Sequence, residues 1–138
     1  MLKRSLALVL LAGFLGALAA CGEAESPTLP VGLLIEDVFV GNGAEARAGD
    51  IVTIHYVGRL LDGTFLDSSR DRNQPFTFRL GAREVIAGWD LGIPGMKSGG
   101  KRLLTVPPSL AYGDQQVGPI PPNSTLRFEI DLLSVVPN

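Results

Sequence analysis

The segment Thr125-Leu-Arg-Phe-Glu-Ile-Asp-Leu132 alternates strictly between polar and apolar residues. A period of two over this length is typical of a β-strand with one face in a core and the other in water. Antiparallel sheets accommodate such strands, because one face of the sheet can stay exposed. The segment therefore predicts an antiparallel sheet.

Four segments upstream also have a strand pattern, and turn signals separate them. Gly41-Asn-Gly43 and Asp62-Gly63 are turn sequences, and Pro107-Pro108 closes the fourth segment. The additional strands are expected at residues 33–40, 51–57, 76–80 and 102–106. With the segment at 125–132, the sequence predicts five strands.

Only residues 84–93 have the apolar spacing of a helix. Val85, Ile86, Trp89 and Ile93 fall on one side, and Pro94 ends the pattern. Two glycines within the segment lower its intrinsic helix propensity, so a short helix is expected. Five strands and one short helix predict an α+β domain in which the helix covers one face of a twisted antiparallel sheet.

The composition of the chain argues against several classes of function. The 138 residues permit one domain and hardly more. Twelve Lys and Arg against fourteen Asp and Glu give a net charge of −2, which argues against a nucleic-acid partner. One Cys and one His argue against a disulfide framework and against a metal site. We expect neither a metal nor another cofactor.

The first twenty residues have the pattern of an export signal. Lys3 and Arg4 precede an apolar run over residues 6–20, which is shorter than the ~20 residues of a membrane span. Leu18-Ala-Ala-Cys21 resembles the bacterial lipobox, in which the Cys is acylated and becomes the mature N-terminus. The sequence thus predicts a lipoprotein signal peptide at 1–20 with lipidation at Cys21. Ordinary cleavage near Ala19, leaving a free thiol, is the alternative.

Residues 21–30 are polar, contain prolines and lack apolar periodicity, so we interpret them as a tether to a single domain at 31–138. Gly22 follows the Cys where an Asp often retains lipoproteins at the inner membrane. We therefore expect a lipid-anchored protein of the bacterial cell envelope. In a cell with two membranes it is expected on the outer membrane, facing the periplasm.

Two possible catalytic motifs lack the context that they need. Gly95-Met-Lys-Ser-Gly-Gly-Lys101 matches a phosphate-binding loop superficially, but Arg102 stands where Ser or Thr would bind Mg²⁺. The expected order of helix, loop and strand is also the reverse of the one required. Ser68 and Ser69 lack the sequence context of a nucleophilic serine, and His55 has no evident partner. Nucleotide binding and Ser-His-Asp hydrolysis are both disfavoured.

The aromatic residues admit two interpretations, a hydrophobic core or a binding site. Trp89 lies at the expected helix start, and Tyr112 lies in the Pro- and Gly-rich stretch 107–122. An aromatic residue in a long loop favours a site, because loops run over the surface and carry function. The set comprises Tyr56, Phe76, Phe78, Trp89, Tyr112 and Phe128.

Several short segments, in order and spacing, are similar to those of one enzyme family. They are Val52-Thr-Ile-His-Tyr-Val-Gly58, Asp67-Ser-Ser-Arg-Asp-Arg72, Pro75-Phe76, Leu80-Gly81, Glu84-Val-Ile-Ala-Gly-Trp89, Ala111-Tyr-Gly113, and Ile120-Pro-Pro122 followed by Thr125-Leu-Arg-Phe128. Over nearly all of residues 33–136 the chain resembles the FKBP-type peptidyl-prolyl cis-trans isomerases. The resemblance implies a five-stranded antiparallel sheet wrapped around a short helix, with a pocket between them.

The resemblance also implies the roles of individual residues. Asp67 and Tyr112 are the polar groups at the rim, and the backbone N–H of Ile86 donates to a bound carbonyl; these three form the expected catalytic set. Asp67 is expected to be held by Tyr56 and Arg72. The expected pocket consists of Trp89 as floor with Tyr56, Leu66, Phe76, Val85, Ile120 and Phe128 around it.

The implied function is isomerisation of Xaa-Pro bonds in exported, proline-containing polypeptides by a monomeric enzyme. One alternative is a chaperone or assembly module of the envelope that binds proline segments with little catalysis. The other is a purely structural envelope lipoprotein, which would have no groove. Two departures from the family pattern argue against tight binding of tacrolimus- or rapamycin-like macrolides. Leu66 stands where the family usually has Phe, with Phe65 displaced by one, and the loop over residues 113–121 is one residue short with Pro119 at an aliphatic position.

Overall fold

The computed structural model describes residues 31–138. The predicted signal peptide, the tether and Cys21 lie outside the described residues. The strands are β1 (Leu34–Phe39), β2 (Ile51–Leu60), β3 (Phe65–Ser68), β4 (Phe76–Arg79), β5 (Lys101–Val106) and β6 (Leu126–Val136). Two short helices, α2 (Ala87–Gly92) and the 3₁₀ helix η2 (Pro108–Leu110), complete the described elements.

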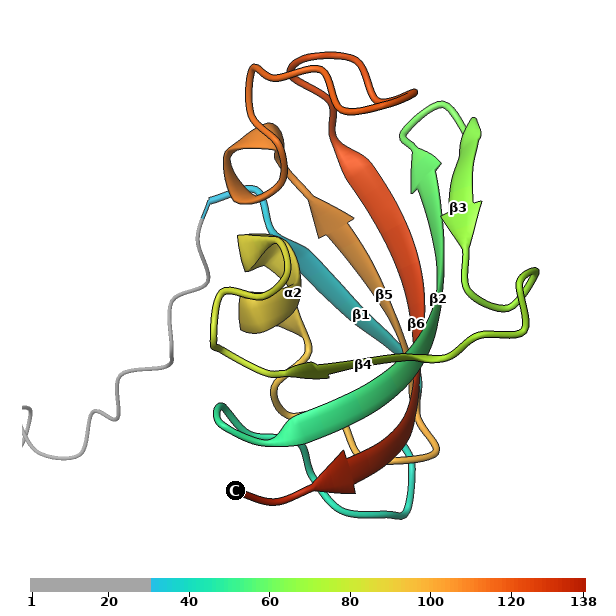
Figure 1. Ribbon diagram of the computed structural model, residues 1–138, viewed down its shortest axis with the longest axis vertical. Helices are drawn as coiled ribbons and strands as arrows, with labels where there is room; N and C mark the ends of the chain where they lie inside the picture. Colours follow the sequence, from blue (N-terminus) through green and yellow to red (C-terminus); the bar gives the residue numbers. More distant parts are fainter. Residues whose placement is uncertain (1–30) are drawn as a thin grey trace, which may run out of the picture.

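All strand pairs are antiparallel, in the order β1-β5-β6-β2-β3. The long strand β2 pairs with β6 along its whole length, from Ile51 to Leu60. Its other edge is shared, because β4 pairs with the first half of β2 and β3 with the second half. Figure 1 shows β3 and β4 as successive segments along this edge, joined by a loop.

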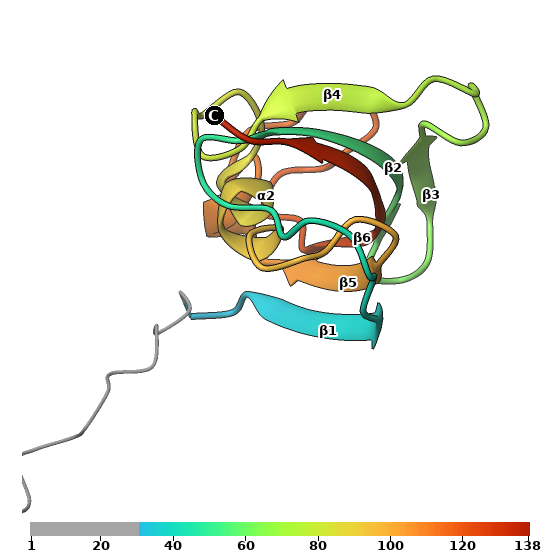
Figure 2. The ribbon, with the colours of Figure 1, turned by 90° about the horizontal axis from the view of Figure 1, so that it is seen from below.

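The sheet curves around α2, which lies inside the curve (Figure 2). The alternation predicted for residues 125–132 is present: Leu126, Phe128 and Ile130 are buried, and Arg127 is exposed. The pairing of β2 with β6 shifts its register where Thr53 opposes Ser134 and Ile54 opposes Leu132. The buried side chains on the concave face of the sheet form one hydrophobic core with Trp89 of the helix.

The two helix glycines allow α2 to pack directly on β5. A Cβ atom added at Gly88 would lie 2.4 Å from Cγ1 of Val106, and one at Gly92 would lie 2.9 Å from Cδ1 of Leu104. Both distances are too short for any larger residue. The glycines that lower helix propensity in the sequence are therefore the residues that let this helix approach the sheet.

A buried arginine joins α2 to the outermost strand. Arg102 of β5 donates from Nε to Asp37 of β1 at 2.7 Å and from Nη1 to the Gly92 carbonyl at 2.8 Å. The same Nη1 donates to the Pro94 carbonyl at 3.1 Å. A cation at a helix C-terminus satisfies its free carbonyls and complements its dipole.

The predicted antiparallel sheet with one short α-helix is confirmed, with two differences in detail. The sheet has six strands rather than five, because β3 forms where no strand was predicted. The helix begins at Ala87 rather than Glu84, since Ile86 at its N-cap is extended with ψ 149°. Within residues 31–138, no helix is long and apolar enough to cross a membrane.

Candidate functional site

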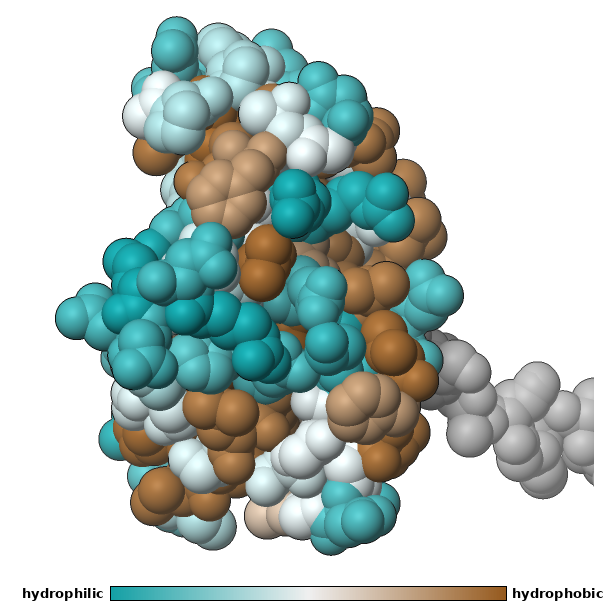
Figure 3. All heavy atoms as spheres, turned by 90° about the vertical axis from the view of Figure 1, so that its right-hand side faces the viewer, coloured by the Kyte–Doolittle hydropathy of each residue, from teal (hydrophilic) through white to brown (hydrophobic). Residues whose placement is uncertain are grey.

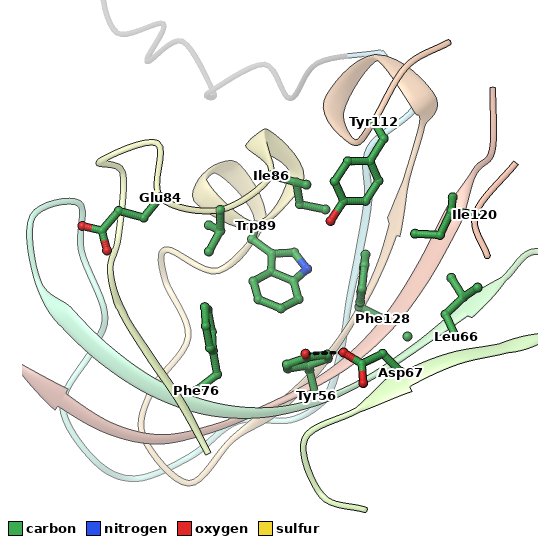
Figure 4. Close-up of a pocket in the computed structure, with 12 residues that line it drawn as sticks. Tyr56, Leu66, Asp67, Phe76, Glu84, Ile86, Trp89, Tyr112, Ile120 and Phe128 are labelled. Carbon is green, nitrogen blue, oxygen red and sulfur yellow. Dashed lines mark hydrogen bonds between the residues drawn. The ribbon is translucent and has the colours of Figure 1, made fainter. Parts of the chain in front are cut away.

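A pocket of about 280 Å³ lies between α2 and the concave face of the sheet. Residues far apart in the sequence line it, and Figure 4 shows their side chains converging from β2, β3, α2, β6 and the loop after η2. The lining residues are Tyr56, Gly58, Leu66, Asp67, Phe76, Glu84, Val85, Ile86, Trp89, Tyr112, Ile120 and Phe128.

Trp89 lies at the centre of the aromatic walls. Its ring centroid is 5.0 Å from that of Tyr56, 5.2 Å from Phe128 and 6.2 Å from Phe76, all in edge-to-face geometry. Such contacts fix ring orientations as well as bury area. The indole Nε1–H of Trp89 is buried, and it is the one buried side-chain nitrogen or oxygen of residues 31–138 without a hydrogen-bond partner. The floor of the pocket is thus apolar except for one unused donor.

Gly58 makes room for one of these walls. A Cβ atom added there would lie 2.9 Å from Cε1 of Phe128. Gly58 on β2 is directly opposite both Phe128 on β6 and Asp67 on β3. The missing side chain therefore lets the Phe128 ring lie across β2 beside the carboxylate.

A bulge in β3 determines which residue faces the pocket. Asp67 opposes Gly58 and Phe65 opposes Arg59, so Leu66 is the extra residue between two consecutive pairs. Leu66 lines the pocket, whereas Phe65 is 48% exposed, with the Arg59 guanidinium 5.7 Å from its ring centroid. Bulges re-aim side chains in this way. The structure therefore places Leu66, not Phe65, at the wall.

Asp67 is held at the rim by the two residues predicted to hold it. Tyr56 donates its hydroxyl to Oδ2 of Asp67 at 2.6 Å, and Arg72 donates to Oδ1. Arg72 also donates to the Tyr56 hydroxyl oxygen at 3.2 Å. The backbone N–H of Ser68 adds a further hydrogen bond to Oδ1 at 2.9 Å. Four hydrogen bonds thus fix the carboxylate and the phenol relative to each other.

These contacts keep both groups in one protonation state near neutral pH. Burial raises the pKa of the Asp67 carboxyl, but hydrogen bonds from Tyr56 and Arg72 and the charge of Arg72 outweigh it, so this pKa lies below its ordinary value. Burial, followed by the Asp67 hydrogen bond, raises the pKa of Tyr56 above its ordinary value. Asp67 is therefore an anion at pH 7, and Tyr56 is neutral.

Two further hydrogen-bond donors belong to residues that line the opposite side of the pocket. The backbone N–H of Ile86 makes no backbone hydrogen bond within residues 31–138, because Ile86 precedes the first turn of α2 in an extended conformation. The Tyr112 hydroxyl points into the pocket towards Trp89, and its side chain is 39% exposed (Figure 4). Neither donor makes a hydrogen bond within residues 31–138.

The loop after η2 is ordered by backbone hydrogen bonds. Val117 and Ile120 exchange two hydrogen bonds, of 3.1 and 2.9 Å, around Gly118-Pro119. Gly118 has φ +54°, a conformation that glycine adopts without the strain of other residues. This tight turn places the Ile120 side chain in the pocket lining.

The structure brings together all ten residues predicted from the sequence, namely Asp67, Tyr112, Ile86, Tyr56, Leu66, Phe76, Val85, Trp89, Ile120 and Phe128. Their roles in binding and catalysis stay predictions. Gly58 and Glu84 also line the pocket and were not predicted, although both lie within quoted motif segments.

His55 has a partner that the sequence did not reveal. Its Nδ1 lies 2.9 Å from Oγ of Ser69, which also accepts the Tyr56 N–H at 2.8 Å. The imidazole therefore belongs to the scaffold behind the Asp67 loop, since it does not line the pocket. Within the described part of the chain, no three His, Cys, Asp or Glu residues are grouped in a way that could hold a metal ion.

Comparison with known proteins identifies this architecture. The family model for FKBP-type peptidyl-prolyl cis-trans isomerases matches residues 43–133. An FK506-binding protein of Neisseria meningitidis serogroup B is 53% identical over 105 residues, covering 75% of this chain and 96% of the relative. FK506-binding protein 4 of Dictyostelium discoideum is 49% identical over 122 residues, covering 84% of this chain but only 33% of the relative. The chain thus spans nearly all of one relative and a third of the other.

Solved structures share the fold. The crystal structure of AtFKBP13 superposes with a TM-score of 0.72 at 48% identity, covering 76% of this chain and 94% of that one. FkpA from Escherichia coli superposes with a TM-score of 0.70 at 45% identity, covering 76% of this chain and 48% of that one. The FKBP-like fold expected from the sequence is confirmed.

Proposed function

Because the chain belongs to the FKBP-type peptidyl-prolyl cis-trans isomerases, we propose that it accelerates rotation about Xaa-Pro bonds in exported polypeptides. The observation that carries the proposal is the pocket itself: an aromatic floor and walls, with polar groups confined to the rim. Such a cavity accepts a prolyl ring and leaves the adjoining peptide groups at the rim, within reach of the donors there.

The reaction requires a change in the environment of the prolyl amide bond and does not require an acid, a base or a nucleophile. The planar amide resists rotation with a barrier of ~18–20 kcal/mol, because resonance gives the C–N bond double-bond character. That resonance makes the planar amide strongly dipolar, and the twisted transition state loses the charge separation. An apolar pocket that excludes water therefore disfavours the planar form relative to the twisted one. No covalent bond is made and no proton moves.

Rim donors select the twisted geometry. The Ile86 N–H and the Tyr112 hydroxyl would each donate to a carbonyl oxygen flanking the rotating bond. Contacts that are better in the twisted state than in the planar state lower the barrier directly. A reduction of about 5.5 kcal/mol corresponds to roughly ten-thousand-fold in rate, which a few such contacts and desolvation can supply.

Asp67 acts in this scheme as a fixed charge rather than as a base. Its carboxylate is ionised and held by Tyr56 and Arg72. A carboxylate in a fixed position orients and polarises the bound peptide group without taking a proton. The isomerisation therefore needs no group that titrates near neutral pH.

A protease-coupled assay tests the proposal. A short chromogenic peptide that is cleaved only when its Xaa-Pro bond is trans reports the cis-to-trans rate with and without the protein. We expect acceleration that is first order in protein and is lost when the pocket is filled by a second prolyl peptide. Binding of prolyl peptides without acceleration would favour the alternative of a proline-binding chaperone or assembly module.

The exported location is a separate part of the proposal, supported by sequence alone. Leu18-Ala-Ala-Cys21 follows a basic and then apolar leader, so we propose that Cys21 carries the lipid anchor in the bacterial envelope. After removal of residues 1–20, ten basic and fourteen acidic side chains give a net charge of −4. In a cell with two membranes, the domain would face the periplasm, where exported polypeptides fold.

A further inference from the structure

A row of side chains crosses the convex face of the sheet, on the side opposite the pocket. Leu34 of β1 opposes Thr105 of β5, which opposes Arg127 of β6. Arg127 opposes Arg59 of β2, which opposes Phe65 of β3. Directly opposed residues project from the same face of a sheet, and neighbouring strands are ~4.8 Å apart. The five residues therefore form one outer row, roughly 19 Å long.

The centre of the outer row carries two like charges without counter-charges. Within residues 31–138, neither Arg59 nor Arg127 forms an ion pair with an acidic side chain. Arg59 donates to the Gly63 carbonyl at 3.2 Å, and Arg127 is exposed. Like charges directly opposite each other destabilise a strand pair. In the free protein this pair therefore costs stability, and a bound anion would relieve that cost.

Apolar side chains flank the two arginines. Leu34 at one end of the outer row is 64% exposed and Phe65 at the other end is 48% exposed. Figure 3 shows the side of the molecule that carries β3, where hydrophobic and strongly hydrophilic residues lie next to one another. The row thus presents the pattern apolar, basic, basic, apolar across the sheet, with the small side chain of Thr105 in between.

A groove of about 180 Å³ adjoins the row. Val57 and Leu103 line it together with the two arginines. Glu129 also lines it, but its carboxylate accepts from Nζ of Lys101 at 2.6 Å and is already paired. A concave site with two guanidinium groups that have no acidic partner within residues 31–138 fits a side chain that carries a carboxylate.

We propose that the outer row and its groove bind an extended polypeptide segment in which acidic residues lie between apolar ones. Charge complementarity favours such a segment, because its acidic side chains would pair with two arginines that have no acidic partner among the described residues. These arginines form a local basic site in a chain whose net charge is −2. That overall negative charge opposes an anionic membrane as the partner, and the concave groove suits an inserted side chain. The surface is a second binding site, whose two arginines lie outside the prolyl pocket although Phe128 lines both cavities.

The test uses the full chain and two fluorescent, proline-free peptides, one with the core Leu-Glu-Glu-Phe and the other with Leu-Gln-Gln-Phe. Fluorescence anisotropy at low ionic strength is expected to show about tenfold tighter binding of the Glu peptide, with the difference shrinking as salt is added. Equal affinities for the two peptides would overturn the proposal.

Arg127→Glu separates the binding role from a structural one. The substitution replaces a repulsive cross-strand pair by an attractive one, so we expect the melting temperature of the free protein to rise by about 2–4 °C. Binding of the Glu peptide should fall at least tenfold, while the isomerase rate on a short peptide stays unchanged. Arg47→Gln removes an exposed arginine elsewhere and should alter neither binding nor melting.

Two results would contradict the assignment. One is an Arg127→Glu variant that binds the Glu peptide as the wild type does. The other is wild-type protein that binds phosphatidylglycerol vesicles in an Arg127-dependent way and binds neither peptide, which would make the surface a membrane contact. Because the isomerase assay reads the prolyl pocket alone, failure of either proposal is recognised independently of the other.

Discussion

Removing the Tyr112 hydroxyl should slow isomerisation without weakening the fold. Tyr112→Phe deletes one oxygen and almost no volume. No hydrogen bond of that hydroxyl to a described residue exists, and the side chain is 39% exposed. The free energy of unfolding should therefore change by less than about 0.5 kcal/mol.

The expected loss of activity follows from a single hydrogen bond. If the hydroxyl donates to a substrate carbonyl in the twisted state, its removal costs about 1–1.5 kcal/mol. That free energy corresponds to a fall in kcat/KM of about five- to twelvefold. The protease-coupled assay measures the rate, and thermal melting of the same samples measures the stability.

Tyr56→Phe provides the matched comparison. The Tyr56 hydroxyl donates to Asp67 at 2.6 Å and accepts from Arg72, so its removal breaks a network within the free protein. The Asp67 side chain is 47% exposed, so solvent screening limits the cost to about 1 kcal/mol. We expect Tyr56→Phe to lower both melting temperature and rate, whereas Tyr112→Phe lowers the rate alone. An unchanged rate in Tyr112→Phe, measured beside an active wild type, would refute the assignment of this donor.

Four further predictions concern pH, packing and the N-terminus. The rate should be nearly flat between about pH 6 and 8, since the lowered pKa of Asp67 keeps it ionised there; a steep profile that vanishes in His55→Gln would contradict the mechanism. The lowered pKa of folded Asp67 also means that its ionised carboxylate stabilises the fold fully above the unfolded pKa of about 4, and that this contribution is lost as the pH falls through the folded pKa. The melting temperatures of the wild type and Asp67→Asn should therefore converge in acid. Gly88→Ala should destabilise the fold by roughly 1–3 kcal/mol in urea titrations, because the new Cβ would lie 2.4 Å from Val106; an unchanged midpoint would show that the contact relaxes. Cys21→Ser should remove acyl mass from the mature chain by mass spectrometry, and a wild-type chain without that mass would exclude lipidation.

Local alternation was sufficient to predict most of the sheet. The pattern at residues 125–132 is preserved in β6 because one face of that strand meets the core and the other meets water. β3 was not predicted, since it has only four residues and a bulge interrupts its alternation. The helix was predicted to start too early because Val85 and Ile86 have helical spacing, although they serve as pocket lining ahead of the first turn.

The pocket could be predicted only through resemblance. Its lining comes from β2, β3, β4, α2, β6 and the loop after η2, and nothing in the spacing of single residues reveals that these elements meet. Gly58 escaped prediction because its contribution is the space it leaves for Phe128, which is visible only once the strands are paired. The Ser69 partner of His55 was hidden for the same reason, as fourteen residues separate them in the chain.

The position of β6 has a consequence for how the chain acquires its structure during synthesis. β6 is the last described strand to be made, yet it lies between β5 and β2 and supplies the partner edge for both. Until residues 126–136 have emerged, the two strands made earlier keep open edges and cannot join into one sheet. The domain therefore cannot fold progressively from its N-terminus, and its contacts are mostly between distant segments, which slows closure. A nascent chain of this protein passes through an interval in which unpaired strands are exposed to proteases and to one another.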